Sequence, residues 1–140
     1  MTPSPTRSDR IFVNLPVRDL ARSVEFFTQL GFAFDPRFTD ENATCMILGE
    51  NLFAMLLVHP FFETFIDKPV ADATKGAEVL IALAFESREA VDRLASRAFA
   101  AGARRYREPQ DLGFMYQWGF EDLDGHIWEI FWMDPAGIPA

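Results

Sequence analysis

The chain has 140 residues, of which 49% are hydrophobic, and its formal net charge is −8. A chain of this length can bury a core of its own, so it needs neither disulfides nor a structural metal to fold. An acidic surface repels nucleic-acid phosphates and anionic lipid headgroups, so we expect no nucleic-acid partner and no membrane partner.

Cysteine content and the terminal segment point to a cytoplasmic protein. Cys45 is the single cysteine, which excludes a disulfide within the chain and a cysteine-rich zinc site. Residues 1–9 are polar and rich in proline, lack the apolar stretch of a signal peptide, and are predicted to be a loose tail. No apolar run reaches the roughly 18 residues that a membrane-spanning helix needs.

The first half of the chain predicts one strand, one helix and three further strands. Residues 11–17 are apolar and β-branched, as is typical of a strand. Asp19 stands where a helix N-cap is expected, and apolar residues then recur at helical spacing until Gly31. Turn-forming clusters separate three strand candidates, at 32–38, 43–48 and 52–58. A short helical turn is predicted at 61–66.

The second half repeats this order about 70 residues later, which is the mark of an internal repeat. A strand is predicted at 79–85, Ser87 is the next N-cap candidate, and a helical stripe ends at Gly102. Asp124-Gly125 is a strong hairpin signal between the last two strands. The three strands of this half are predicted at 103–107, 114–120 and 127–133.

These patterns predict an α+β fold built from paired βαβββ modules. The modules are expected at 10–67 and 77–134, with a linker at 68–76, tails at 1–9 and 135–140, and one structural domain overall. Each helix must cover one face of its sheet, so the other faces are left to form a curved, cup-like mixed sheet with the helices outside. A concave surface of this kind suits a small molecule.

Several segments resemble the vicinal oxygen chelate superfamily, which includes glyoxalases, bleomycin-resistance proteins and extradiol dioxygenases. The matching segments are Leu15–Leu20, Ser23–Phe27, Leu30–Phe32 and Phe120–Glu129. The order of elements agrees from about residue 10 to residue 134, a span that covers both repeated modules. The resemblance implies a homodimer and a small-molecule ligand in the cup.

Metal-dependent members of the superfamily, such as lactoylglutathione lyase, hold a divalent ion with four side chains, two from each half. The resemblance places these four positions at Phe12, Met55, Leu80 and Glu129. A phenyl ring and an isobutyl group have no lone pair to donate, and a thioether is a poor ligand for zinc or magnesium. We therefore predict that the protein holds no metal and no cofactor.

Strand alternation predicts which side chains face the cup. Phe12 and Asn14 on the first strand are predicted to face it, and so are Phe53, Met55 and His59 around the fourth. The predicted ligand-binding residues are Phe12, Asn14, Phe53, Met55, Leu80, Tyr116 and Trp118.

Two residues are candidates for catalysis. Glu129 can act as a general base or a hydrogen-bond acceptor, and the structural alternative is an inherited position paired with a donor or water. His59 can be an acid or base at the rim, and the alternative is that it caps a turn.

The leading interpretation is metal-independent binding of a small apolar or aromatic molecule, similar to bleomycin-resistance proteins. The first alternative is an enzyme of the lyase, isomerase or dioxygenase type with an atypical site around Glu129. The second alternative is a non-catalytic accessory module whose cup is filled by its own side chains. Fold alone does not separate these functions.

Overall fold

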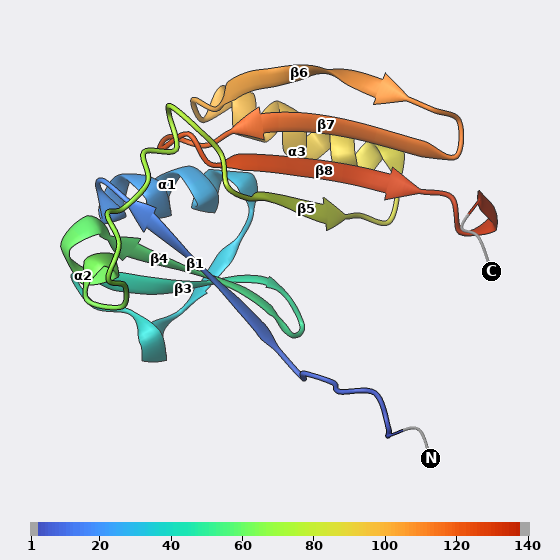
Figure 1. Cartoon of the computed structure of the whole chain (residues 1–140). Coiled ribbons are helices and arrows are strands. Elements are labelled where there is room, and N and C mark those ends of the chain that lie inside the picture. The colour runs from blue at the N-terminus through green and yellow to red at the C-terminus, as the bar shows by residue number, and fades with distance from the viewer. Residues whose placement is uncertain (1–2, 138–140) are drawn as a thin grey trace. The chain divides into compact units, whose positions relative to one another are not determined.

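The computed structural model describes residues 3–137 (Figure 1). Its contacts divide the chain into two compact units, and the end stretches 1–2 and 138–140 of the predicted tails lie outside the described residues. The first unit contains the chain up to Arg22 and Phe32–Val70; the second contains Ser23–Gly31 and the chain from Ala71 onward. In the described range no helix is long and apolar enough to cross a membrane.

A four-stranded sheet forms the first unit, in the order β1-β4-β3-β2. Strand β1 is parallel to β4, and the other neighbours are antiparallel. A short helix, α2 (His59–Glu63), follows β4 and contacts both β1 and β4. The strands are β1 (Ile11–Val17), β2 (Ala33–Asp35), β3 (Ala43–Gly49) and β4 (Leu52–Val58).

Alternation along these strands gives the first sheet one buried face. Leu15 and Val17 of β1 are buried, while Phe12 and Asn14, which precede them, are exposed. The buried face continues through Ala54, Leu56 and Met46 on the neighbouring strands, none of which exposes any surface. Each fully buried large apolar side chain contributes about 1.5–3 kcal/mol, so this face fixes the register.

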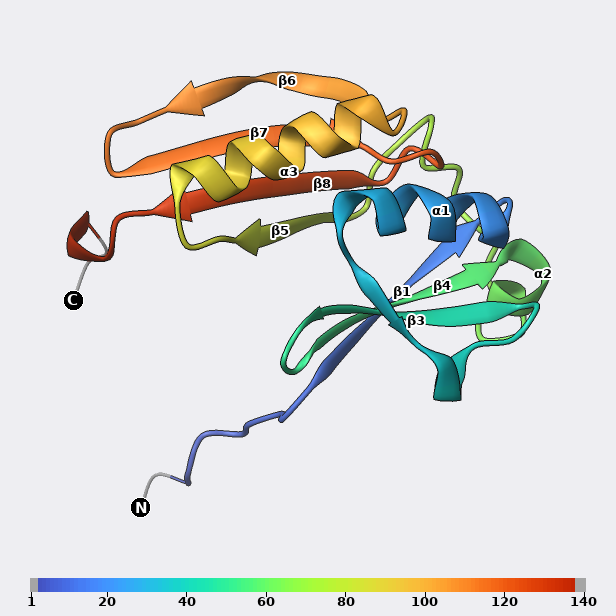
Figure 2. The same cartoon turned by 180° about the vertical axis from the view of Figure 1, so that it is seen from behind.

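The second unit repeats the arrangement, with the sheet order β5-β8-β7-β6. Helix α3 (Arg88–Ala100) covers one face, as Figure 2 shows from behind. Its buried residues are those of the predicted stripe: Val91, Leu94, Ala95 and Ala98. The strands are β5 (Leu80–Ala84), β6 (Arg104–Asp111), β7 (Met115–Glu121) and β8 (Ile127–Met133). The α+β prediction of two βαβββ modules is confirmed.

The N-caps and the helix-ending glycines are also confirmed. Asp19 accepts a hydrogen bond from the backbone N–H of Arg22 at the start of α1 (Leu20–Leu30). Ser87 accepts one from the backbone N–H of Ala90 at the start of α3. Gly31 follows α1 with a φ of 103°, a conformation that glycine adopts without the cost a Cβ would impose.

The turn between β7 and β8 is built around Asp122, which exposes only 3% of its surface. Its carboxylate accepts hydrogen bonds from the backbone N–H groups of Asp124 and His126 and from Nε1 of Trp128, at 2.9, 3.0 and 3.0 Å. Burial raises the pKa of Asp122, while the charge of His126 and these N–H donors pull it down. The predicted hairpin signal at Asp124-Gly125 is therefore a turn held by a buried carboxylate.

Three predicted boundaries were wrong. The strand expected at 32–38 ends at Asp35, because Pro36 starts a 3-10 turn (Pro36–Phe38) whose N-cap is the Asp35 side chain. The helical turn expected at 61–66 forms earlier, over His59–Glu63. The strand expected at 103–107 continues to Asp111, since irregular pairing around Arg107 accommodates the extra residues.

Candidate ligand-binding site

The open face of the first sheet carries a stacked pair of aromatic rings. Phe12 and Phe53 are register partners on β1 and β4, with ring centroids 4.8 Å apart and planes 14° from parallel. Phe12 leaves 45% of its surface exposed. Met55 and Asn14 are the next register pair on the same face. These side chains form an aromatic and thioether surface that suits a flat, apolar group.

Further along this face the side chains are buried within the protein. Cys45 lies opposite Met55 and exposes 1% of its surface, and Leu57 exposes 2%. Burial raises the pKa of the Cys45 thiol, which disfavours the nucleophilic thiolate form. Beside it, Asp35 pairs with Arg37 at 2.7 Å. The Asn14 amide donates to the carbonyl of Phe12 at 3.3 Å, a contact within its own strand.

Glu129 stands on the open face of the second sheet between two small residues. Its register partners are Ala82 on β5 and Gly119 on β7, and Arg107 lies beyond Gly119 on β6. A methyl group placed on Gly119 would lie 3.5 Å from the ring of Tyr106, so that ring borders the space beside the carboxylate. The hollow here holds about 10 Å³, room for one water molecule.

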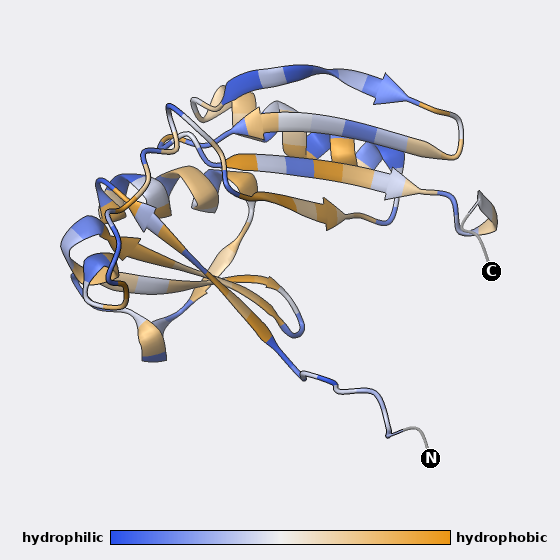
Figure 3. Cartoon of the chain, viewed as in Figure 1, coloured by the Kyte–Doolittle hydropathy of each residue, from blue (hydrophilic) through white to orange (hydrophobic). Residues whose placement is uncertain are grey.

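This second face changes from apolar to polar across the sheet. On the β5 and β8 side it carries Leu80, Ala82, Ala84 and Phe131. On the β6 and β7 side it carries polar residues, among them Gln110 and Gln117, whose side-chain amides are joined by a 3.0 Å hydrogen bond. Figure 3 shows the same contrast between the hydrophobic β5 and the hydrophilic β6. Glu129 lies at the boundary between the two halves.

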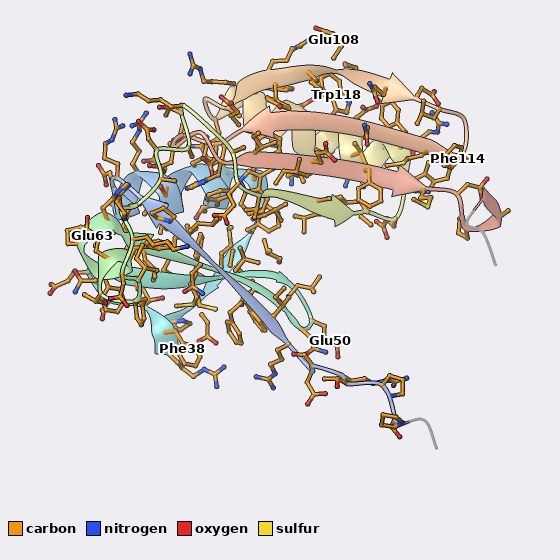
Figure 4. The ribbon with its side chains drawn as sticks, viewed as in Figure 1. Phe38, Glu50, Glu63, Glu108, Phe114 and Trp118 are labelled. Carbon is orange, nitrogen blue, oxygen red and sulfur yellow. The ribbon has the colours of Figure 1, made fainter. Side chains whose placement is uncertain are left out.

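Tyr116 and Trp118 lie on the α3 face of this sheet. Gly119 is the partner of Glu129, so alternation turns its neighbour Trp118 and then Tyr116 to the other side. Both donate to Asp92 of α3, at 2.5 Å from the Tyr116 hydroxyl and 3.0 Å from Trp118 Nε1. Burial and the Asp92 contact raise the pKa of Tyr116. Trp118, labelled in Figure 4, also borders the hollow, and ligand binding by these two residues stays a prediction.

His59 was expected on the strand face with Phe53 and Met55, and that placement was wrong. Strand β4 ends at Val58, and His59 is the first residue of α2, where the adjacent Pro60 favours the start of a helix. A catalytic role for His59 stays a prediction. The sequence analysis did not identify Gly119 and Gln117 as residues of this face. The predicted hairpin could have identified them, because it pairs Glu121 with Ile127 and so determines which β7 residues share a face with Glu129.

The four metal-ligand positions that the resemblance implies do not fit a divalent ion. Phe12 lies beside Phe53, and Met55 lies beside Asn14. Leu80 lies beside Ile127, and Glu129 beside Ala82. Among the side chains of these four register pairs, Asn14 in the first sheet offers an amide and Glu129 in the second offers a carboxylate. The other six side chains have no nitrogen or oxygen donor. In residues 3–137 no three His, Cys, Asp or Glu side chains come together as a metal site, and such ions usually take at least three protein ligands.

Comparison with known proteins agrees with the observed fold. The bleomycin resistance protein-like N-terminal family matches residues 10–49. A hypothetical protein from S. aureus superposes with a TM-score of 0.75 at 27% identity, covering 90% of this chain and 95% of that one. A glyoxalase/bleomycin resistance protein/dioxygenase from Nocardioides gives 0.73 at 24% identity, covering 98% and 91%. Residues 10–49 thus match a bleomycin-resistance-type family, and the whole chain has the vicinal oxygen chelate fold.

Other members of the superfamily are more distant in sequence but similar in fold. The fosfomycin resistance protein FosX from Listeria monocytogenes superposes with a TM-score of 0.67 at 18% identity, covering 94% of this chain and 98% of that one. No curated protein sequence matches the chain. The vicinal oxygen chelate fold is thus established, and function has to be argued from the faces described above.

Proposed function

We propose that this protein binds a small, partly apolar or aromatic molecule on the open face of a sheet, without a metal ion. The observation that carries the proposal is the Phe12–Phe53 stack, in which Phe12 stays 45% exposed although Leu15 and Val17 on the opposite side of β1 are buried. A folded chain usually buries such rings, and accessible aromatic surface beside a few polar groups is typical of a ligand site.

Metal independence is supported by the donor set. An amide and a carboxylate supply too few oxygen atoms for zinc, magnesium or calcium, and the remaining positions are phenyl, thioether, isobutyl and methyl groups. Binding would then rest on apolar contact and hydrogen bonds. This matches the bleomycin-resistance type of member more closely than the metal-dependent enzymes.

A neutral aromatic probe tests the proposal. Isothermal titration with indole-3-propionamide is expected to show binding, and Phe12→Ala should weaken it about threefold to tenfold, the usual value of an aromatic contact. Phe38→Ala is the matched control, because Phe38 exposes 55% of its surface on the 3-10 turn after β2, the edge strand opposite β1 in the sheet. Lack of binding by a folded protein, or equal effects of the two variants, would contradict the proposal.

A second candidate function is a lyase- or isomerase-type enzyme that uses Glu129 as a base. The supporting observation is the water-sized hollow beside its carboxylate, where Gly119 and Ala82 leave room for a reacting group. In that case Glu129→Gln abolishes turnover and preserves ligand binding, since the amide keeps the shape and cannot take a proton. Turnover retained by this variant would reject the enzyme.

We also propose a homodimer in the cytoplasm, which the resemblance and the lone, buried Cys45 support. Light scattering coupled to size exclusion should give twice the 15.9 kDa chain mass. A monomer at micromolar concentration would contradict the dimer. The remaining alternative, an accessory module whose cup is filled by its own side chains, predicts no binding of indole-3-propionamide.

A further inference from the structure

We propose that the ligand carries a carboxylate, bound by Arg107, and a hydrogen-bond donor for Glu129, on either side of Gly119 on the second sheet. This inference rests on the proposed function, because it names the chemistry of the molecule bound on the open face of a sheet.

Arg107 differs from the other arginines whose contacts are seen in the described chain. Arg37, Arg88 and Arg105 each form an ion pair with a carboxylate, at 2.7, 2.6 and 3.2 Å. The guanidinium of Arg107 instead lies over the ring of Tyr106, 5.4 Å from its centroid. This cation–π contact uses the face of the ring and no carboxylate, so the N–H donors of Arg107 can bind an added anion.

Two residues of opposite charge flank Gly119 in one register row of the second sheet. Arg107 and Glu129 are both neighbours of Gly119, on opposite sides of β7, so their backbones lie about two strand spacings, or roughly 10 Å, apart. Both residues line the same hollow. Gly119 has no side chain of its own, and the ring of Tyr106 borders the space above it, so a ligand that reaches both charges lies against this ring.

The remaining groups around the hollow favour a singly charged anion. Glu108 also lines it and is already paired with Arg105; Figure 4 labels Glu108 on β6. One guanidinium matches one carboxylate with two parallel hydrogen bonds. A doubly charged phosphate would leave a charge unmatched beside Glu129, on a protein whose net charge is already −8.

The neighbouring row adds hydrogen bonds and an apolar floor. The single bond between the Gln110 and Gln117 amides uses one donor and one acceptor, so further amide donors can reach a ligand oxygen. The same row continues to Phe131 on β8 and Ala84 on β5, which can contact the apolar part of the molecule. The ligand class is therefore a small aromatic or apolar carboxylic acid with an N–H or O–H group.

Three matched probes test this inference by titration calorimetry: indole-3-propionate, its neutral amide, and 1-naphthalenepropionate, which lacks the N–H donor. We expect the indole acid to bind about tenfold more tightly than the amide and also more tightly than the naphthalene acid, since hydrogen bonds to charged groups are the stronger ones. Arg107→Gln should remove the advantage of the acid over the amide. Glu129→Gln should reduce the advantage of the indole acid over the naphthalene acid.

Arg104→Gln is the matched control, because Arg104 lies on the same strand beside Glu121 and does not line the hollow. If the amide binds as tightly as the acid, or if Arg107→Gln and Arg104→Gln have equal effects, this inference is wrong while the proposed function stands. If neither the amide nor the acids bind the folded protein, the proposed function itself fails.

Discussion

The buried carboxylate of Asp122 stabilises the turn between β7 and β8. Its carboxylate has three N–H donors around it, and one of them is the indole of Trp128. Asp122→Asn turns an N–H₂ group toward a donor, so we expect the free energy of unfolding to fall by about 1–3 kcal/mol. Urea denaturation measures this loss.

A double-mutant cycle measures the contribution of the Asp122–Trp128 hydrogen bond apart from the other hydrogen bonds of the turn. In a Trp128→Phe background the opposing indole N–H is gone, so the Asp122→Asn substitution should cost less than it does in the natural sequence. An equal cost in both backgrounds would show that the Trp128 contact contributes nothing.

Cys45 gives a prediction about pH. Its thiol has a raised pKa in the folded protein because it is buried. The unfolded chain releases this proton at the ordinary thiol pKa, so the stability that Cys45 contributes is present below that pH and declines as pH rises through the folded pKa. Compared with Cys45→Ala, the natural protein should lose stability in alkaline solution and show a constant difference from pH 6 to about 8. A stability advantage of the natural protein over Cys45→Ala that grows as pH rises would contradict this prediction.

At the scale of single residues, strand alternation predicted part of the site. It placed Phe12 and Asn14 on the open face, because the apolar residues Val13, Leu15 and Val17 alternate with them along β1. It did not place Tyr116 and Trp118, since every residue from 114 to 118 is bulky or amphipathic and gives no alternating signal. There the register with β8 decides the face.

Among the elements, the linker is held against the β7–β8 turn. Gly125 has a φ of 92°, and a Cβ at this position would lie 2.9 Å from the backbone of Ala73 and Thr74. Gly125→Ala is therefore expected to cost at least about 1–3 kcal/mol, through strain and displacement of the linker. Thermal denaturation measures the effect.

Gly76 in the same linker provides the control. A Cβ there meets no atom within 4 Å, and its φ lies outside the left-handed range. Gly76→Ala should be neutral or slightly stabilising, because it reduces the freedom of the unfolded chain. Equal losses in the two variants would contradict the packing of the linker on the turn.

Helices and most strands could be predicted from the sequence because local chemistry determines them. Asp19 and Ser87 cap their helices, and Gly31 and Gly102 end them with positive φ. The length of β6 could not be predicted, since Arg104–Asp111 is mostly polar and contains a proline that normally disfavours a strand. Pairing with β7 overrides that local preference.

For the whole molecule, the repeated order of elements was sufficient to predict two βαβββ modules, and the structure adds that each forms a four-stranded sheet with the same strand order. It was not sufficient to predict function, because the superfamily places different chemistry on one fold. What distinguishes this chain is the identity of a few side chains on the open faces: phenyl and thioether groups on the first sheet, and Glu129, Gly119 and Arg107 on the second.

The most direct test of metal-independent binding combines elemental analysis of the purified protein with calorimetry of indole-3-propionamide before and after treatment with EDTA. We predict substoichiometric metal and an unchanged dissociation constant, since the binding surface is made of side chains alone. One tightly held ion per chain, with probe binding lost on its removal and restored by its return, would contradict the account.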